Sequence, residues 1–219
     1  MRACVLVVLL LSASALFAQP EVVRVRITGF AVEGNRITKE RIIARELTFA
    51  EGDTLESKEL YARLERSAQN LKNLSLFNTV ELLPLYLTST EVFIHVIVSE
   101  RWYWWPELIF KVADPNFNTW WLTKDFGRVN WGGYLNRYNF RGRNETLYIK
   151  AQLGYTREFG LRYRVPNLDR RQRWGGSMGV SYAEQNEVTV ATAGGKRVFA
   201  RYADRWVRTE RRADLQVVF

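Results

Sequence analysis

Few side chains in this chain could carry catalytic or metal chemistry. The 219 residues include one histidine, His95, and one cysteine, Cys4. A Ser–His–Asp triad would need His95 beside an activated serine, yet the sequence has no Gly-x-Ser-x-Gly turn. Without a cluster of His and Cys residues, a zinc or iron site is not expected. The sequence therefore predicts no catalytic residue, no metal, no cofactor and no enzymatic activity.

The most distinctive residues are aromatic, and residues 100–106 read Glu-Arg-Trp-Tyr-Trp-Trp-Pro. Successive side chains of a strand point to opposite faces, so a core strand rarely carries tryptophan on both. An aromatic ring with one polar atom is stable at a membrane–water interface, although an aromatic corner of a soluble core is the alternative. Seven tryptophans are predicted to lie at such an interface: Trp102, Trp104, Trp105, Trp120, Trp121, Trp131 and Trp174.

Targeting signals and charge divide the chain into parts. Residues 1–20 have a positive start, an apolar run and small residues near the end, which is the form of a secretory signal peptide. Residues 21–100 carry ten Lys and Arg against twelve Asp and Glu, whereas residues 101–219 carry twenty-one against eleven. In the second part the basic residues alternate with apolar ones. We therefore expect them to face a watery lumen or lipopolysaccharide, and we expect no nucleic-acid partner.

Residues 21–100 are expected to form a small α+β domain. Alternating apolar residues predict strands, and apolar residues at helical spacing predict helices. Thr38 is the expected N-cap of the first helix, and Pro84 suggests that its strand lies at an edge or bulges. The predicted elements are, in order, a strand at 22–27, a helix from about 38, a helix at 56–72, and strands at 77–87 and 91–98.

Short motifs in this region resemble those of a POTRA domain. They occur in the order typical of that family, and they are Gly34-Asn35-x-x-Thr38, Arg45-Glu46-Leu47, Glu51-Gly52-Asp53 and Leu74-x-Leu76-Phe77. The resemblance implies that an extended client protein adds itself to an exposed sheet edge by backbone hydrogen bonds. We expect this edge at residues 78–87, with Val80, Leu82 and Tyr86 as client-binding residues. An ordinary strand protected by Pro84 is the alternative.

Beyond residue 100, alternation predicts antiparallel strands with one apolar and one polar or basic face. The clearest examples lie at 129–135, 147–155, 159–165 and 174–182. Periodicity alone is compatible with a soluble sandwich or with a membrane barrel. The signal peptide, the aromatic strand ends and the basic face favour the barrel. Strands of about ten residues are also long enough to cross a bilayer when tilted.

Four further motifs resemble the start of the barrel in the BamA/TamA superfamily, also called bacterial surface antigens. They lie at 101–106, 114–118, 139–144 and 163–166, and they are most similar to single-POTRA members of Bacteroidetes-type bacteria. The predicted architecture is a signal peptide at 1–20, a POTRA domain at 21–100, and the N-terminal part of an outer-membrane β-barrel at 101–219. We count about five to seven strands in this part, fewer than the family barrel has. Although the terminal Phe219 resembles an outer-membrane sorting signal, we expect a fragment.

The resemblance implies an outer-membrane protein assembly factor with its POTRA domain in the periplasm. Its partners would be unfolded outer-membrane proteins, outer-membrane lipid and possible accessory assembly subunits. Two alternatives remain at this point, namely a polypeptide secretion pore of the same architecture and a soluble periplasmic binding protein with a β-sandwich.

Overall fold

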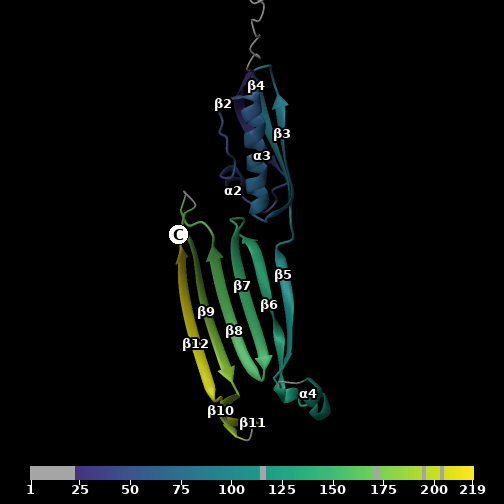
Figure 1. The fold of residues 1–219 in the computed structure, drawn as a ribbon, viewed down its shortest axis with the longest axis vertical. Coiled ribbons are helices and arrows are strands. Elements are labelled where there is room, and N and C mark those ends of the chain that lie inside the picture. Colours follow the sequence, from purple (N-terminus) through teal and green to yellow (C-terminus); the bar gives the residue numbers. More distant parts are fainter. Residues whose placement is uncertain (1–22, 114–116, 170–172, 194–195, 203–204) are drawn as a thin grey trace, which may run out of the picture.

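The computed structural model describes residues 23–113, 117–169, 173–193, 196–202 and 205–219, so the expected signal peptide lies outside it. A small α+β domain is followed along the long axis of the molecule by a larger antiparallel sheet (Figure 1). The elements are β1 (Arg24–Glu33), α2 (Glu40–Ala44), β2 (Thr54–Glu56), α3 (Ser57–Asn73), β3 (Phe77–Tyr86), β4 (Glu91–Glu100), β5 (Trp104–Val112), α4 (Phe117–Thr123), a 3-10 turn (Phe126–Arg128), β6 (Val129–Phe140), β7 (Glu145–Gly154), β8 (Thr156–Val165), β9 (Gly175–Gln185), β10 (Glu187–Ala193), β11 (Lys196–Arg201) and β12 (Arg208–Val218).

The α+β domain is a four-stranded sheet with its helices packed against one core. Its strand order is β2-β1-β4-β3, in which β1 and β4 are parallel and the other pairs are antiparallel. The predicted order of strands and helices is present, with the short strand β2 added between the helices. Val92, Ile94 and Val96 of β4 are fully buried together with Leu60 and Leu71 of α3. The alternation predicted for this strand is therefore confirmed.

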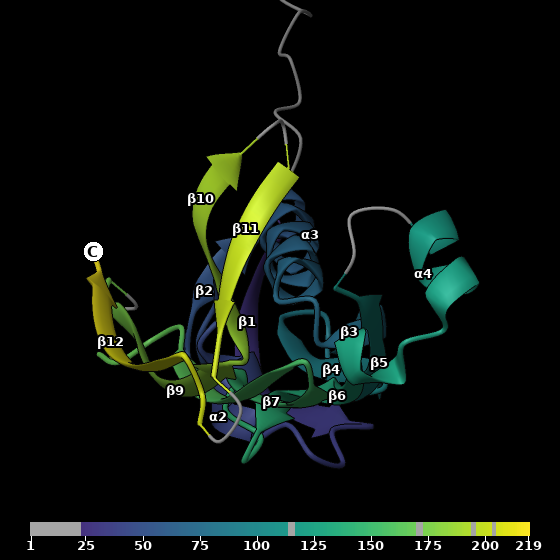
Figure 2. The ribbon, with the colours of Figure 1, turned by 90° about the horizontal axis from the view of Figure 1, so that it is seen from below.

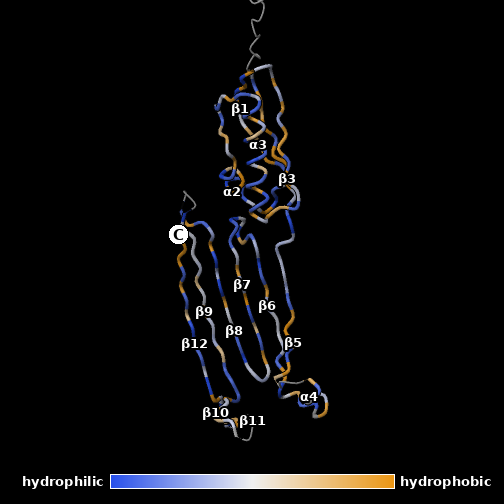
Figure 3. Tube along the Cα trace, viewed as in Figure 1, coloured by the Kyte–Doolittle hydropathy of each residue, from blue (hydrophilic) through white to orange (hydrophobic). Residues whose placement is uncertain are grey.

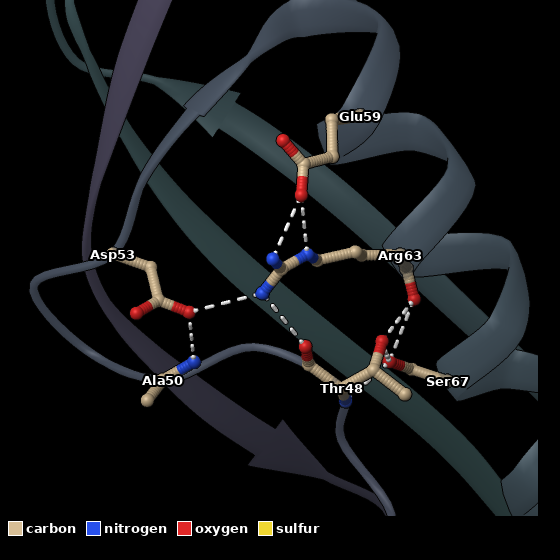
Figure 4. A network of polar contacts seen from close by, with 6 residues as sticks. All are labelled: Thr48, Ala50, Asp53, Glu59, Arg63 and Ser67. Atoms are coloured by element: carbon tan, nitrogen blue, oxygen red, sulfur yellow. Dashed lines mark hydrogen bonds and ion pairs between the residues drawn. The ribbon is translucent and has the colours of Figure 1, made fainter.

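A polar network fixes α3 to the loop that precedes it (Figure 4). The Arg63 guanidinium donates hydrogen bonds to the Glu59 carboxylate at 2.7 Å, to the Thr48 carbonyl at 3.1 Å and to the Asp53 carboxylate at 3.4 Å. The same Asp53 carboxylate accepts a hydrogen bond from the backbone N–H of Ala50 at 3.0 Å. One guanidinium thus joins the Glu51-Gly52-Asp53 turn to the helix by charge-assisted bonds.

The second part of the chain is a curved six-stranded antiparallel sheet of order β12-β9-β8-β7-β6-β5 (Figure 2). Its strand number within the described residues agrees with the predicted five to seven. The end of the sheet next to the α+β domain is called the near end here, and the opposite end is called the distal end (Figure 1). The hairpin β10–β11 and helix α4 both lie at the distal end (Figures 1 and 2).

The two faces of this sheet differ in polarity, and hydropathy alternates along each strand (Figure 3). On the apolar face, the side chains of Leu108 and Leu215 are 92% and 78% exposed. On the charged face, ion pairs join Lys150 to Glu158 at 2.6 Å and Arg162 to Asp214 at 3.4 Å. No second sheet covers the apolar face in the described part of the chain. The described residues therefore do not form a closed sandwich, because that fold buries its apolar faces against each other.

Candidate functional site

Strand β3 is a long terminal strand of the α+β sheet, as expected for residues 78–87. It pairs only with β4 among the described strands, and it runs for ten residues, whereas the opposite terminal strand β2 has three. Backbone N–H and C=O groups along the outer side of such a strand can pair with another extended chain. Both views place β3 on the same side of the molecule as β5, the terminal strand of the larger sheet (Figures 1 and 2).

The three side chains predicted for this edge lie in different environments. Val80 is 6% exposed and belongs to the core, Leu82 is partly buried against that core, and Tyr86 is exposed. The Tyr86 hydroxyl donates a hydrogen bond to the Tyr61 hydroxyl at 3.5 Å, and this bond raises the pKa of Tyr86. The Val80 side chain is therefore not accessible to a bound strand.

Sequence reasoning missed two exposed residues on the same strand. Leu83 and Leu85 lie on the face of β3 that points away from the core, opposite His95 and Phe93 of β4. The sequence pattern already indicated this exposure. If Val80 and Leu82 face the core, Leu83 and Leu85 must face the opposite side of the strand. The terminal strand β3 therefore carries exposed apolar side chains beside its unpaired backbone groups.

Most of the predicted interface tryptophans fall into two groups at the two ends of the larger sheet. Trp102, Trp104, Trp105 and Trp174 lie at the near end, and Trp121 and Trp131 lie at the distal end. Trp120, also distal, differs because it is 5% exposed and its indole N–H donates to the Asp125 carbonyl at 2.9 Å. Strands β6 to β9 between the groups have 10 to 12 residues. This length suits a tilted strand that crosses a bilayer.

The turn between β6 and β7 contacts the α+β domain and joins two motifs that are far apart in sequence. Asn139 is fully buried in this contact, and its side-chain N–H donates to the Thr38 hydroxyl at 2.8 Å. The backbone N–H of Lys39 donates to the Gly142 carbonyl at 3.0 Å. Thr38 was expected to cap the first helix, but that prediction is wrong: Lys39 occupies the N-cap position and makes no side-chain cap.

A chain of hydrogen bonds extends from this contact into the domain. The Tyr103 hydroxyl donates to the Leu76 carbonyl at 2.9 Å and lies 3.2 Å from the Thr38 hydroxyl. Because the proton of Tyr103 is already engaged, Thr38 donates to Tyr103 while it accepts from Asn139. Burial raises the pKa of Tyr103, which keeps its hydroxyl neutral.

Two further groups hold the same loop in place. The Glu100 carboxylate accepts hydrogen bonds from the backbone N–H groups of Ile37 at 3.0 Å and Thr38 at 2.6 Å. A Cβ atom at Gly142 would lie 2.1 Å from the Ile37 carbonyl oxygen, and Gly142 has a φ of +68°. Both the space and the backbone therefore require glycine here. We call this contact, formed by Thr38, Glu100, Tyr103, Asn139 and Gly142, the junction.

Neither a metal site nor a membrane helix is found where the structure describes the chain. No group of three or more His, Cys, Asp or Glu residues could hold a metal ion there. No described helix has both the length and the apolar character needed to span a membrane.

Comparison with known families identifies the α+β domain at the start of the described chain. Residues 25–101 match the POTRA family model, described as "Surface antigen variable number repeat". This match confirms the predicted POTRA domain. No match was found among curated proteins.

Solved structures extend the likeness to the larger sheet. BamA from Haemophilus ducreyi lacking POTRA domains 1–3 is similar with a TM-score of 0.54 and 16% identity, over 74% of this chain and 28% of that chain. CdiB from Acinetobacter baumannii has a TM-score of 0.42 at 16% identity, over 80% and 31% of the two chains. CdiB from Escherichia coli has a TM-score of 0.47 at 12% identity, over 88% and 41%.

At such low identity only the fold is comparable, and the two CdiB scores are too low to add to it. The chain spans less than half the length of each of these proteins. The predicted fold class is confirmed, namely a POTRA-type α+β domain followed by an antiparallel sheet of BamA type. The resemblance to BamA/TamA-type surface antigens is supported at this level, while the Bacteroidetes-type detail is not confirmed.

Proposed function

From a POTRA domain joined to an amphipathic sheet of BamA-type fold, we propose that the chain is the N-terminal part of an outer-membrane protein assembly factor. In this proposal residues 21–100 lie in the periplasm and residues 101–219 lie in the outer membrane. One observation carries the proposal: the domain with the long terminal strand β3 is joined through β4 to a sheet whose apolar face is exposed. An exposed apolar face of this kind is typical of a surface that meets a membrane or another protein.

The proposed mechanism needs no cofactor or nucleotide. An unfolded outer-membrane protein presents an extended segment to β3 and pairs with it through backbone hydrogen bonds, which make few demands on sequence. The exposed side chains of Leu83 and Leu85 contact that segment on one face of the extended sheet, and Tyr86 contacts it on the other. Release of the client into the membrane is driven by burial of its own apolar strand faces in lipid.

Photo-crosslinking tests the proposed edge. The full chain is reconstituted in lipid vesicles with a photoreactive amino acid at Leu83 or Leu85, both exposed on β3. An unfolded outer-membrane protein is then added. The matched control carries the same group at Arg66 of α3, which is also exposed. We expect client adducts from β3 and not from α3. Equal labelling of both positions would contradict the proposal.

A secretion pore is the second candidate, because the charged face of the sheet could line a watery path. Arg162, Arg164 and Arg212 share this face. The two functions differ in the fate of the client. An assembly factor leaves the client in the membrane, where alkaline carbonate does not extract it, whereas a pore delivers a soluble client to the far side of the vesicle.

A further inference from the structure

A cleft of about 530 Å³ opens between the POTRA domain and the near end of the sheet. Four arginines line it, Arg41 and Arg45 from α2 and its end, and Arg141 and Arg143 from the turn between β6 and β7. The junction holds these two segments together. We call this space the arginine cleft.

Positive charge in the arginine cleft exceeds the acidic groups that could neutralise it. Arg141 pairs with the buried Glu145 carboxylate at 3.0 Å, and Arg143 lies 3.9 Å from the same carboxylate. Arg45 pairs with its neighbour Glu46 at 3.0 Å. Arg41 has no acidic partner among the described residues.

The remaining acid of the lining is also engaged. One Asp169 carboxylate oxygen accepts hydrogen bonds from the backbone N–H groups of Arg173 at 2.8 Å and Trp174 at 3.1 Å. The lining therefore holds four guanidinium groups against the carboxylates of Glu145 and Asp169, and Glu46, outside the lining, pairs with Arg45. Arg141 also donates to the Tyr163 hydroxyl, which leaves Arg41 and Arg143 as the cations with the weakest acidic pairing. Such a site favours an anion that arginine can bind by paired N–H groups.

The position of the cleft indicates what kind of anion fits. Tyr163 and Val165 line it, and both lie on the apolar face of β8 together with Phe159 and Leu161. Leu168, which also lines the cleft, is 58% exposed. The cleft thus begins where the exposed apolar face of the sheet ends. A ligand there would meet guanidinium groups at one end and an apolar surface at the other.

We propose that the arginine cleft binds the phosphodiester headgroup of an anionic phospholipid from the near leaflet, with its acyl chains along the apolar face of β8. This inference rests on the proposed membrane location of the sheet. A bound lipid would link α2 of the POTRA domain to the sheet through one phosphate, and so would add to the contact made by the junction.

Native mass spectrometry of the full detergent-solubilised chain tests the proposal. The protein is titrated with phosphatidylglycerol, or with phosphatidylcholine as the control, whose choline ammonium cancels the phosphate charge and leaves the headgroup zwitterionic. We expect phosphatidylglycerol to bind more tightly. The R41Q/R143Q double variant should lose about tenfold in affinity, because it removes two partly exposed guanidinium contacts to the phosphate. The control R24Q/R66Q removes the same charge from exposed positions outside the cleft, and it should bind as the unaltered protein does.

Three outcomes would overturn the proposal: equal binding of the two lipids, equal losses in the two double variants, or inorganic phosphate binding as tightly as the lipid. The single variant R41Q controls for misfolding, because Arg41 has no acidic partner in the described part of the chain and its replacement breaks no ion pair there. Its affinity for phosphatidylglycerol should fall about threefold. No client is present in this experiment. Its failure would leave the assembly role standing, and failure of the crosslinking at β3 would leave the lipid site standing.

Discussion

The POTRA domain and the larger sheet contain the same alternating strand pattern in opposite environments. In β4 the apolar side chains of Val92, Ile94 and Val96 are fully buried beneath the helices. In β8 the side chains of Phe159 and Leu161 are 43% and 47% exposed. The elements that cover a strand, and not its alternating pattern, therefore decide whether its apolar face is buried or exposed. The first face is buried within the chain, whereas the second is exposed, and in the proposed function it meets lipid.

The largest effect is expected from a charge placed in the buried core of the POTRA domain. Ile94→Asp places a charge in the centre of the POTRA core, where no partner is available among the described residues. We expect a cost of more than about 4 kcal/mol and an unfolded POTRA domain. Limited proteolysis of the full chain should then digest residues 25–101 first. Leu85→Asp, on the exposed side of β3, is the control that should remain resistant.

A charge on the face proposed to meet lipid should reduce the free energy of unfolding by less, and only in a membrane. Leu161→Arg lies midway along β8 on the apolar face. We expect a loss of about 2–4 kcal/mol in the free energy of unfolding from lipid vesicles, measured by guanidinium titration. Arg162→Gln, at the same depth on the charged face, breaks only an exposed ion pair with Asp214, and should cost under about 1 kcal/mol. Equal losses would mean that the apolar face does not meet lipid.

The junction between the two regions should respond more weakly still. Thr38→Val keeps the shape of the side chain but leaves the Asn139 amide and the Tyr103 hydroxyl without one partner each. We expect a loss of about 1–3 kcal/mol in the contact. Spin labels at Arg66 and Thr209, both exposed, should then give a broader distance distribution. The control Thr88→Val, at an exposed turn, should leave the distance distribution narrow. A narrow distribution in Thr38→Val would contradict the role of Thr38 in fixing the junction.

The smallest expected effect is a pH dependence of the junction. Burial raises the pKa of Tyr103 above its ordinary value of 10.0, so the unfolded chain loses this proton first. The neutral hydroxyl makes its full contribution to the free energy of unfolding below pH 10.0, and this contribution is lost as pH rises through the pKa of Tyr103 in the folded protein. Between pH 10.0 and the folded pKa of Tyr103, the free energy of unfolding should fall more steeply with pH in the unaltered protein than in Tyr103→Phe. The difference in slope should be up to about 1.4 kcal/mol per pH unit. Parallel profiles would exclude this group as the cause.

Local periodicity predicted most elements of the fold. The helix expected at 56–72 is α3 at Ser57–Asn73, and the strand expected at 147–155 is β7 at Glu145–Gly154. Both depend on side-chain spacing that repeats over several turns or residue pairs. Strand β2 was missed because three residues are too few for a period to appear.

The candidate site was less predictable than the fold. The edge strand β3 was expected at about the right place, since Pro84 is tolerated only where a strand can spare an N–H group. Which of its side chains are exposed was not foreseen: Val80 supports the core, whereas Leu83 and Leu85 face outward. Thr38 resembled a helix cap because capping residues are recognised from local sequence, while its partner Asn139 lies 101 positions away.

The sequence by itself determined the amphipathic strands, the placing of most aromatic residues toward the strand ends, the basic character of the second part and the POTRA motifs. Each of these follows from residue types and short spacings, which the geometry of one strand or helix converts directly into faces. The tertiary structure alone decided that β3 ends its sheet and that Thr38 meets Asn139. It also brought Arg41 and Arg141 into one cleft. These contacts join segments about a hundred residues apart, and no local period encodes which distant segments will meet.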